Sequence, residues 1–467
     1  MSERDDERRV VLADPDSLLG MLQRGRGKGF LMALERPPQE VWPLLLECIT
    51  NDPRLDTQCE DRAEYYASLI LRTGMDLEAI HSLVKRDDDS TNGLVLSTLE
   101  SLAERGSHRA TEILREYLVY GREVMWIARV LAKLPVQGAM EGIDEVLCRR
   151  VSDDPQLYEE FKSDVEWSWE LYCRDDEDDR KTGGYLLPVC EPWKSLCRKH
   201  AGLAELFSRV GLPYDDPTSE RKVTDADVEE LSVEELLSTV DKARFYPSRR
   251  ALIERVSVED EDHLLQSLSS DNKYRVMLAF CGLGELGTPK AFEAVKSYIE
   301  GSEEADSSVR RRAFHAIEQM PGSLTLETAR QWFRSKEWRF QIAAGDILEN
   351  HATPEDIPLL IEALRTPETL RREDFRLSSA VNAMARFEGI GPVPELEQIF
   401  REAQSCFDRY RAADAMAATS PVHFTAEYAF ECLWDCHWDT PELGCEMVSL
   451  SMNDALDRLR ELAADAN

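Results

Sequence analysis

The sequence of 467 residues has no apolar run long enough to cross a membrane. A spanning helix needs about 20 consecutive apolar residues, and the longest apolar patches, such as residues 276–283, have the size expected of a protein core. The first nine residues are mostly charged and no apolar segment follows them, which argues against a secretory signal. We therefore expect a soluble, cytoplasmic protein without a membrane partner.

Basic residues are too few to balance the acidic ones. The chain has 56 Lys and Arg against 90 Asp and Glu, which gives a formal net charge of −34. Binding to a phosphate backbone depends on clustered cationic side chains. The composition, with acidic runs at residues 87–89, 175–179 and 259–262, therefore argues against a nucleic-acid partner. A charged partner, if there is one, is expected to be a basic protein.

The common catalytic and cofactor motifs are absent from the sequence. It contains no phosphate-binding loop, no His-Glu-x-x-His, no Gly-x-Ser-x-Gly and no EF-hand loop. Gly282, Gly284 and Gly287 are spaced somewhat like a dinucleotide-binding motif, but they lie in or just after a predicted helix. Such a motif needs a strand, a turn and then a helix. We expect no catalytic residues and no cofactor, so an enzyme is disfavoured.

The 11 cysteines are an odd number without a tight framework, so they are expected to be reduced thiols in the core. Structural zinc sites usually combine two close Cys or His pairs. Neither of the two Cys/His groups in the sequence has that spacing, so we expect no bound metal. These groups are Cys190, Cys197 and His200, and Cys432, Cys436, His437 and Cys445.

What the sequence does contain is a repeated pattern of paired helices. The clearest unit predicts a helix over residues 274–286 and a second over residues 290–299. Gly287 is expected to end the first helix, Thr288 to cap the second, and Pro289 to occupy its first position. The expected core residues of the first helix are Leu278, Ala279, Leu283 and Leu286.

The same layout recurs along the C-terminal half of the chain. The arginines that open the successive units are separated by 35, 29, 37 and 33 residues; they are Arg275, Arg310, Arg339, Arg376 and Arg409. Weaker pairs are predicted at residues 62–85, 94–120 and 124–148. A period of about 30 to 40 residues predicts an all-α protein, an α-solenoid of antiparallel helix pairs.

The unit with an aromatic residue or Val before Arg, then small residues, then Leu-Gly-x-Leu-Gly-Thr-Pro-x-Ala resembles HEAT repeats. It is most similar to the bacterial type noted in phycobilin lyases. Residues 272–300 carry the best match, and the resemblance extends over residues 271–435. It implies a HEAT-like solenoid in which the helix-opening arginine, here Arg310, forms an ion pair with an acidic residue of the next unit.

Four segments follow from these patterns. Residues 1–40 are an N-terminal extension with short helices, residues 41–155 an N-terminal helical repeat array, residues 156–223 an irregular helical insert with an acidic linker, and residues 224–467 a C-terminal HEAT-like repeat array. In the insert, an apolar stripe predicts one helix over residues 157–172, and a second helix is predicted over residues 193–207. Ser232 and Glu235 form a predicted capping box.

The function that this fold favours is a non-enzymatic scaffold or adaptor that binds a protein partner. Stacked helix pairs leave a long surface that binds by area and complementarity without a reactive group. Most of the nine tryptophans are expected in the core, but one exposed on a concave surface would be a binding hot spot. The nine include four in the C-terminal half: Trp332, Trp338, Trp434 and Trp438.

Two alternatives remain open. One is a lyase or chaperone-like HEAT protein acting on a partner protein, as the resemblance to bilin lyases implies. The other is a HEAT-like DNA-binding or glycosylase-type protein, which needs a local positive strip despite the net charge. The residues available for such a strip are Arg249, Arg250, Arg310, Arg311, Arg312, Arg371 and Arg372.

Overall fold

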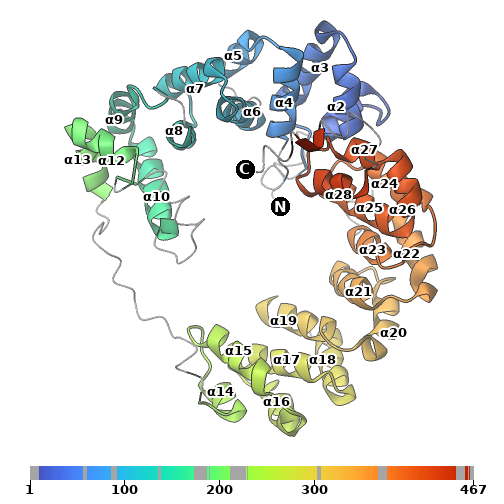
Figure 1. Ribbon diagram of the computed structural model, residues 1–467. Coiled ribbons are helices and arrows are strands. Elements are labelled where there is room, and N and C mark those ends of the chain that lie inside the picture. The colour runs from blue at the N-terminus through green and yellow to red at the C-terminus, as the bar shows by residue number, and fades with distance from the viewer. Residues whose placement is uncertain are drawn as a thin grey trace. The chain divides into compact units, whose positions relative to one another are not determined.

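The computed structural model describes residues 10–55, 60, 62–85, 92–134, 138–172, 187–188, 190–210, 228, 230–301, 307–365, 376–448, 458–460 and 462. The chain forms two compact units (Figure 1). Unit 1 contains residues 1–218, 404–407 and 427–467, and unit 2 contains residues 219–403 and 408–426.

Every regular element in the described part of the chain is a helix, and no strand occurs there. The predicted all-α fold is therefore confirmed. No helix in these residues has both the length and the apolar composition needed to cross a membrane.

Unit 1 begins with short helices and continues with longer pairs. Its helices are α1 (Leu18–Arg24), α2 (Gly27–Leu34), α3 (Pro38–Thr50), α4 (Ala63–Thr73), α5 (Glu78–Val84), α6 (Asn92–Glu104), α7 (His108–Tyr120), α8 (Val124–Lys133), α9 (Ile143–Asp153), α10 (Pro155–Tyr172), α12 (Trp193–Lys199), α13 (Ala201–Val210), α27 (Ala429–Cys432) and α28 (Asp439–Met447). The predicted N-terminal pairs correspond to α4 with α5, α6 with α7, and α8 with α9.

Segments from opposite parts of the sequence meet inside unit 1, where α2 packs against α27 (Figure 1). The ring of Phe30 stacks on that of Trp434, with centroids 5.0 Å apart. Beside them, the Arg26 guanidinium donates to the Glu431 carboxylate at 3.0 Å; Arg26 is buried and Glu431 is mostly buried. The C-terminal residues thus complete the core of the N-terminal helices, which the sequence pattern did not predict.

The single helix predicted over residues 193–207 is wrong, because the structure has two helices there, α12 and α13. His200 leaves the helical conformation, with φ −123° and ψ 103°. Its imidazole Nδ1 then accepts a hydrogen bond from the backbone N–H of Leu203 at 3.2 Å and so caps the start of α13. The longer helix predicted from the apolar stripe is confirmed as α10, with Leu157, Phe161 and Val165 buried.

Unit 2 is a succession of helix pairs. Its elements are α14 (Val233–Thr239), α15 (Phe245–Arg255), η2 (Val258–Asp260), α16 (Glu261–Ser267), α17 (Lys273–Leu286), α18 (Pro289–Gly301), α19 (Ser307–Glu318), α20 (Gly322–Trp332), α21 (Trp338–His351), η3 (Pro354–Asp356), α22 (Ile357–Leu364), α23 (Arg376–Met384) and α24 (Pro394–Glu402), with most of α25 (Cys406–Thr419) and α26 (Pro421–Glu427). We call α15, α17, α19, α21 and α23 the first helices, and α16, α18, α20, α22 and α24 the second helices.

The predicted ends of the clearest pair are confirmed. Gly287 adopts the left-handed conformation with φ 56° directly after α17, where a residue with a side chain is strained. The Thr288 hydroxyl accepts a hydrogen bond from the Ala291 N–H at 3.0 Å, and Pro289 is the first residue of α18. The predicted capping box of Ser232 and Glu235 is also present, at the start of α14.

Neighbouring first helices pack against each other, from α15 to α17 and on to α19, α21 and α23 (Figure 1). The predicted core residues Leu278, Ala279 and Leu283 are fully buried in this layer. Leu286 is only half-buried, because it lies at the last turn of α17, next to the exposed connection to α18.

Ion pairs join several neighbouring helix pairs of unit 2. The expectation for Arg310 is confirmed, since its guanidinium lies 3.1 Å from the carboxylate of Glu337, which immediately precedes α21. Three further links, not predicted from the sequence, lie on the second helices or at their ends: Lys290–Asp262 at 2.5 Å, Arg330–Asp356 at 2.6 Å and Arg365–Glu395 at 2.8 Å.

Candidate functional site

Three arginines gather on the first helices of unit 2. Arg249 comes from α15, and Arg311 and Arg312 come from the first turns of α19. Arg311 is exposed, whereas Arg249 and Arg312 are half-buried. The guanidinium of Arg312 reaches across α17 and lies 5.6 Å from the centre of the Phe245 ring on α15. We call Arg249, Arg311 and Arg312 the arginine cluster.

The arginine cluster surrounds two titratable side chains. On α17, burial raises the pKa of the Cys281 thiol, while Arg312 and Arg249 act in the opposite direction, and Arg249 also hydrogen-bonds the thiol. On α19, burial lowers the pKa of His315, and the charges of Arg312, Arg311 and Arg249 lower it further. The three guanidinium groups thus act on common neighbours and reinforce each other's positive potential.

No arginine of this cluster forms an ion pair with a residue that the structure describes. The Nε atoms of Arg249 and Arg312 are buried and have no hydrogen-bond partner in the same part of the chain. Arg310, Arg330 and Arg365 in the same unit each contact a carboxylate. Unpaired guanidinium groups beside one another are unfavourable unless an anion compensates them.

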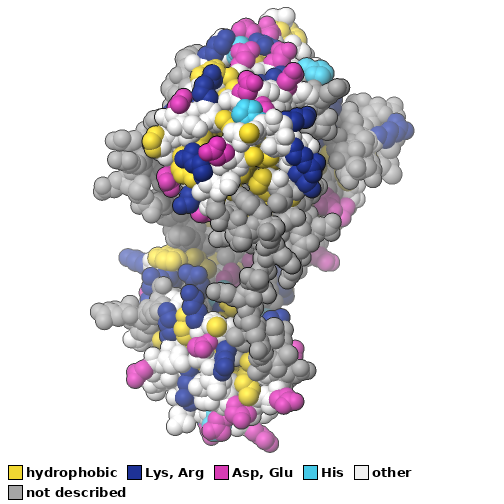
Figure 2. All heavy atoms as spheres, turned by 90° about the vertical axis from the view of Figure 1, so that its left-hand side faces the viewer, with side chains coloured by type: hydrophobic (Ala, Val, Ile, Leu, Met, Phe, Trp, Pro, Cys, Tyr) yellow, Lys and Arg dark blue, Asp and Glu magenta, His cyan; other side chains and the backbone are white. Residues whose placement is uncertain are grey.

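Aromatic side chains flank the arginine cluster. Tyr246, three residues before Arg249 on α15, is 68% exposed, and Trp338 at the start of α21 is 48% exposed. Arg339 lies over the Trp338 ring at 5.2 Å. In the lower part of Figure 2, which shows unit 2, Lys and Arg side chains gather on the face that carries α14 and α15, and Asp and Glu side chains lie toward the lower edge.

The predicted positive strip is only partly brought together. Arg310 is buried in its ion pair with Glu337, so it is a structural residue. Arg250 is exposed on α15. Arg371 and Arg372 lie outside the described residues. The strip is therefore reduced to a local cluster on α15 and α19.

A pair of carboxyl groups lies at the other end of α19. Burial, and after it the charge of the neighbouring Asp346, raise the pKa of Glu318 to about 8. Burial and Glu349 raise the pKa of Asp346 to about 6. Glu318 Oε2 lies 3.0 Å from His315 Nδ1. Burial thus favours the neutral form of both side chains, and their contact is compatible with a hydrogen bond between neutral groups.

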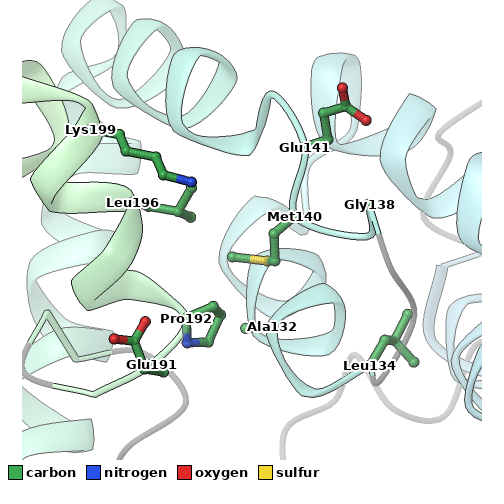
Figure 3. A pocket seen from close by; sticks show the side chains of 9 residues that line it. All are labelled: Ala132, Leu134, Gly138, Met140, Glu141, Glu191, Pro192, Leu196 and Lys199. Atoms are coloured by element: carbon green, nitrogen blue, oxygen red, sulfur yellow. The ribbon is translucent and has the colours of Figure 1, made fainter.

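Unit 1 contains a cavity of about 600 Å³ between α8, the turn at residues 138–142 and α12 (Figure 3). Its lining residues are Ala132, Leu134, Gly138, Met140, Glu141, Glu191, Pro192, Leu196 and Lys199. The charged groups of Glu141, Glu191 and Lys199 lie on different sides of it rather than converging on one point (Figure 3). Glu191 already accepts a hydrogen bond from the Ser195 N–H at 3.1 Å. The lining offers no acid–base or nucleophile–base pair.

The two Cys/His groups of the sequence differ in their surroundings. Cys148 Sγ lies 3.8 Å from His200 Nδ1, and burial raises the pKa of Cys197 to about 11. In the second group, Cys432 and His437 are buried, and Cys436 and Cys445 are half-buried. Over the described ranges, no three His, Cys, Asp or Glu side chains are close enough to hold a metal ion.

One acidic run can be placed. Asp260 accepts hydrogen bonds from the N–H and the hydroxyl of Ser257, both at 2.9 Å, and Asp262 pairs with Lys290. These carboxylates cap a helical turn and link two helices. The runs at residues 87–89 and 175–179 lie outside the described residues.

The four tryptophans divide evenly between core and surface. Trp332 and Trp434 are buried, whereas Trp338 and Trp438 are exposed. Trp338 belongs to unit 2, and Trp438 lies in unit 1, where it stacks on His437 with centroids 4.8 Å apart. The sequence alone did not separate the exposed pair from the buried pair.

No known family model matches the chain, and no curated protein is significantly similar to it.

Proposed function

We propose that this chain is a non-enzymatic scaffold built on a HEAT-like solenoid, and that it binds a protein partner through the first helices of unit 2. The observation that carries the proposal is the combination of exposed Tyr246 and Trp338 with the arginine cluster on neighbouring first helices. Tyr, Trp and Arg are the residue types that contribute most to binding energy at protein interfaces.

Catalysis at this face has less support than partner binding. The Cys281 thiol lies beside the arginine cluster, and its pKa is raised, which disfavours a reactive thiolate. The lyase or chaperone-like alternative has no residues here that match a bilin site. The DNA-binding alternative has the arginine cluster in its favour, and a binding measurement with a DNA duplex tests it.

The proposal is tested by placing a photo-crosslinking amino acid at single exposed positions of the full chain, in lysate of the organism that encodes it. Tyr246 and Trp338 are the test positions. Val258, before α16 and 68% exposed, and Val422, on α26 and 84% exposed, are matched controls away from the first helices. We expect one and the same protein to be crosslinked from both test positions and from neither control.

The captured protein is then purified and its affinity measured. Tyr246→Ser and Trp338→Ser are each expected to weaken binding by about tenfold or more, since hot-spot residues contribute about 2 kcal/mol or more. Val422→Ser should leave binding unchanged. Equal affinities for all variants, or crosslinks that do not distinguish test positions from controls, would overturn the proposal. The basic character expected for the partner stays a prediction, checked by weaker binding at higher salt.

A further inference from the structure

We propose that the arginine cluster of Arg249, Arg311 and Arg312 binds the phosphate group of a phosphorylated segment of the partner protein. The inference rests on the proposed function, because it names the chemistry that the binding face of unit 2 recognises. Its starting point is that three cations lie together without a carboxylate partner in the described residues of a chain whose net charge is −34.

The placement of the three arginines suits one compact anion. They come from two helices, α15 and α19, on either side of α17, and all three act on His315, whereas Arg249 and Arg312 both act on Cys281. Two of the guanidinium groups are fixed, Arg312 by the Phe245 ring and Arg249 by the Cys281 thiol. A fixed guanidinium loses little further freedom when it binds a ligand.

Phosphate satisfies this cluster better than a single carboxylate does. A phosphorylated side chain carries a charge of about −1.5 to −2 and three acceptor oxygens, enough for hydrogen bonds with three guanidinium groups. A carboxylate has one charge and two oxygens. Arginine clusters recognise phosphorylated peptides in this way in other proteins.

A nucleic-acid backbone fits the same surface less well. A duplex carries one negative charge per about 1.7 Å of its length, so its binding requires a stripe of cations. Here the cluster is confined to α15 and α19, and α21, the next first helix, carries the carboxyl groups Asp346 and Glu349 as well as the exposed Arg339 at its start. The carboxyl groups disfavour a phosphate backbone that continues along α21.

The neighbouring aromatic side chains offer a place for the rest of the segment. Tyr246 lies on the same face of α15 as Arg249, and Trp338 follows directly after Glu337, which pairs with Arg310 beside Arg311. Both rings are exposed. The phosphate would fix the position of the segment, and its apolar side chains would contact these rings.

The test measures binding of a fluorescein-labelled peptide, Gly-Ser-Gly-Ser-Gly with phosphoserine at both serine positions, to the full chain by fluorescence anisotropy. The comparison ligands are the same peptide with serine, the same peptide with glutamate, and a random DNA duplex. We expect the phosphorylated peptide to bind more tightly than all three, and inorganic phosphate to compete with it.

Three substitutions test whether the phosphopeptide binds at the arginine cluster. Arg249→Ser, Arg311→Ser and Arg312→Ser are each expected to weaken the phosphopeptide by about ten- to a hundredfold, as for the loss of a charge-assisted hydrogen bond. Arg312→Lys keeps the charge but loses the forked donor, and is expected to give a smaller loss. Arg334→Ser removes one exposed charge near the end of α20 and is expected to have no effect.

Several results would overturn the inference: equal binding of the serine, glutamate and phosphorylated peptides, tighter binding of the DNA duplex, or an equal loss in Arg334→Ser. Arg311 is exposed and forms no ion pair or hydrogen bond with a described residue, so its variant stays informative if Arg249→Ser fails to fold. A partner that crosslinks from Tyr246 and Trp338 while no phosphopeptide binds would refute the phosphate site and leave the scaffold standing. The absence of any crosslinked partner would refute the proposed scaffold function itself.

Discussion

Gly284 in α17 faces Ala316 in α19 so closely that a Cβ at position 284 would lie 2.9 Å from the Ala316 Cα. The two first helices reach this distance because position 284 has no side chain. Gly282 is also closely packed, since an added Cβ there would lie 2.8 Å from the Leu264 side chain of α16. These glycines, which looked loosely like a nucleotide-binding motif, serve helix packing.

Gly284→Val is therefore expected to destabilise unit 2. An inserted side chain must push α17 and α19 apart, and overpacking of this kind costs about 1–3 kcal/mol. The measurement is the midpoint of urea unfolding. Gly301→Ala, at the end of α18 where an added Cβ meets nothing within 4 Å, is the control and should unfold at nearly the wild-type midpoint. Equal midpoints for the two variants would contradict the packing.

Leu283→Ala tests the face that α17 buries. Leu283 is fully buried, so the substitution removes apolar contacts and leaves a cavity, at a cost of about 2–5 kcal/mol. Leu286→Ala removes the same atoms at a half-buried position and should cost clearly less. Thermal unfolding followed by circular dichroism compares the two. An unchanged melting temperature for Leu283→Ala would show that the buried face is misassigned.

Arg330→Ala tests the links between the second helices. The side chain of Asp356 is 2% exposed and lies 2.6 Å from Arg330 Nε and 3.2 Å from its Nη2. Thr353 also donates to it through its N–H and its hydroxyl. Removing Arg330 leaves a buried carboxylate short of donors, which is expected to cost about 1.5–3 kcal/mol.

The stability lost in Arg330→Ala should depend on pH. Burial raises the pKa of Asp356, but Arg330 and Thr353 outweigh it and the pKa is lowered from 3.8. A lowered pKa contributes stability above the unfolded value that is lost as the pH falls through the folded value. The stability difference between wild type and Arg330→Ala should therefore shrink as the pH falls below about 4. A difference that stays constant down to acid pH would show that Arg330 acts through packing alone.

Glu318→Gln tests the carboxyl pair at the end of α19. The pKa of Glu318 is raised from 4.5 to about 8, by burial first and then by Asp346. The folded state therefore holds a proton that the unfolded state releases, so stability falls as the pH rises from 4.5 to about 8. Glutamine stays neutral and can still donate to His315, so the variant should lose much of this decline and be more stable than wild type at alkaline pH.

The measurement is the urea midpoint of both proteins across this pH range. The pKa of Asp346 is also raised, so the stability of the variant should still fall partly as the pH rises. Glu327→Gln, an exposed carboxyl on α20, is the control and should follow the wild-type curve. Parallel curves for Glu318→Gln and wild type would show that Glu318 is ionised in the folded state.

Helix content and several helix ends were predictable from the sequence, because they depend on neighbours a few residues apart. The end of α17 at Gly287, the cap by Thr288 and the capping box of Ser232 with Glu235 are all of this kind. The break at His200 was missed, since a histidine side chain that caps a helix has no strong sequence signature.

Only the tertiary structure decided what the arginines and tryptophans do. Arg26 meets Glu431 across 405 residues of sequence. A contact between residues so far apart produces no periodic pattern in the sequence. Arg310 and Arg311 are adjacent in the sequence, yet one is buried against Glu337 and the other has no carboxylate partner in the described chain. The sequence by itself determined which residues form helices, because backbone hydrogen bonds and caps are local. Which charges stay uncompensated depends on where neighbouring helices place their carboxylates, and that only packing decides.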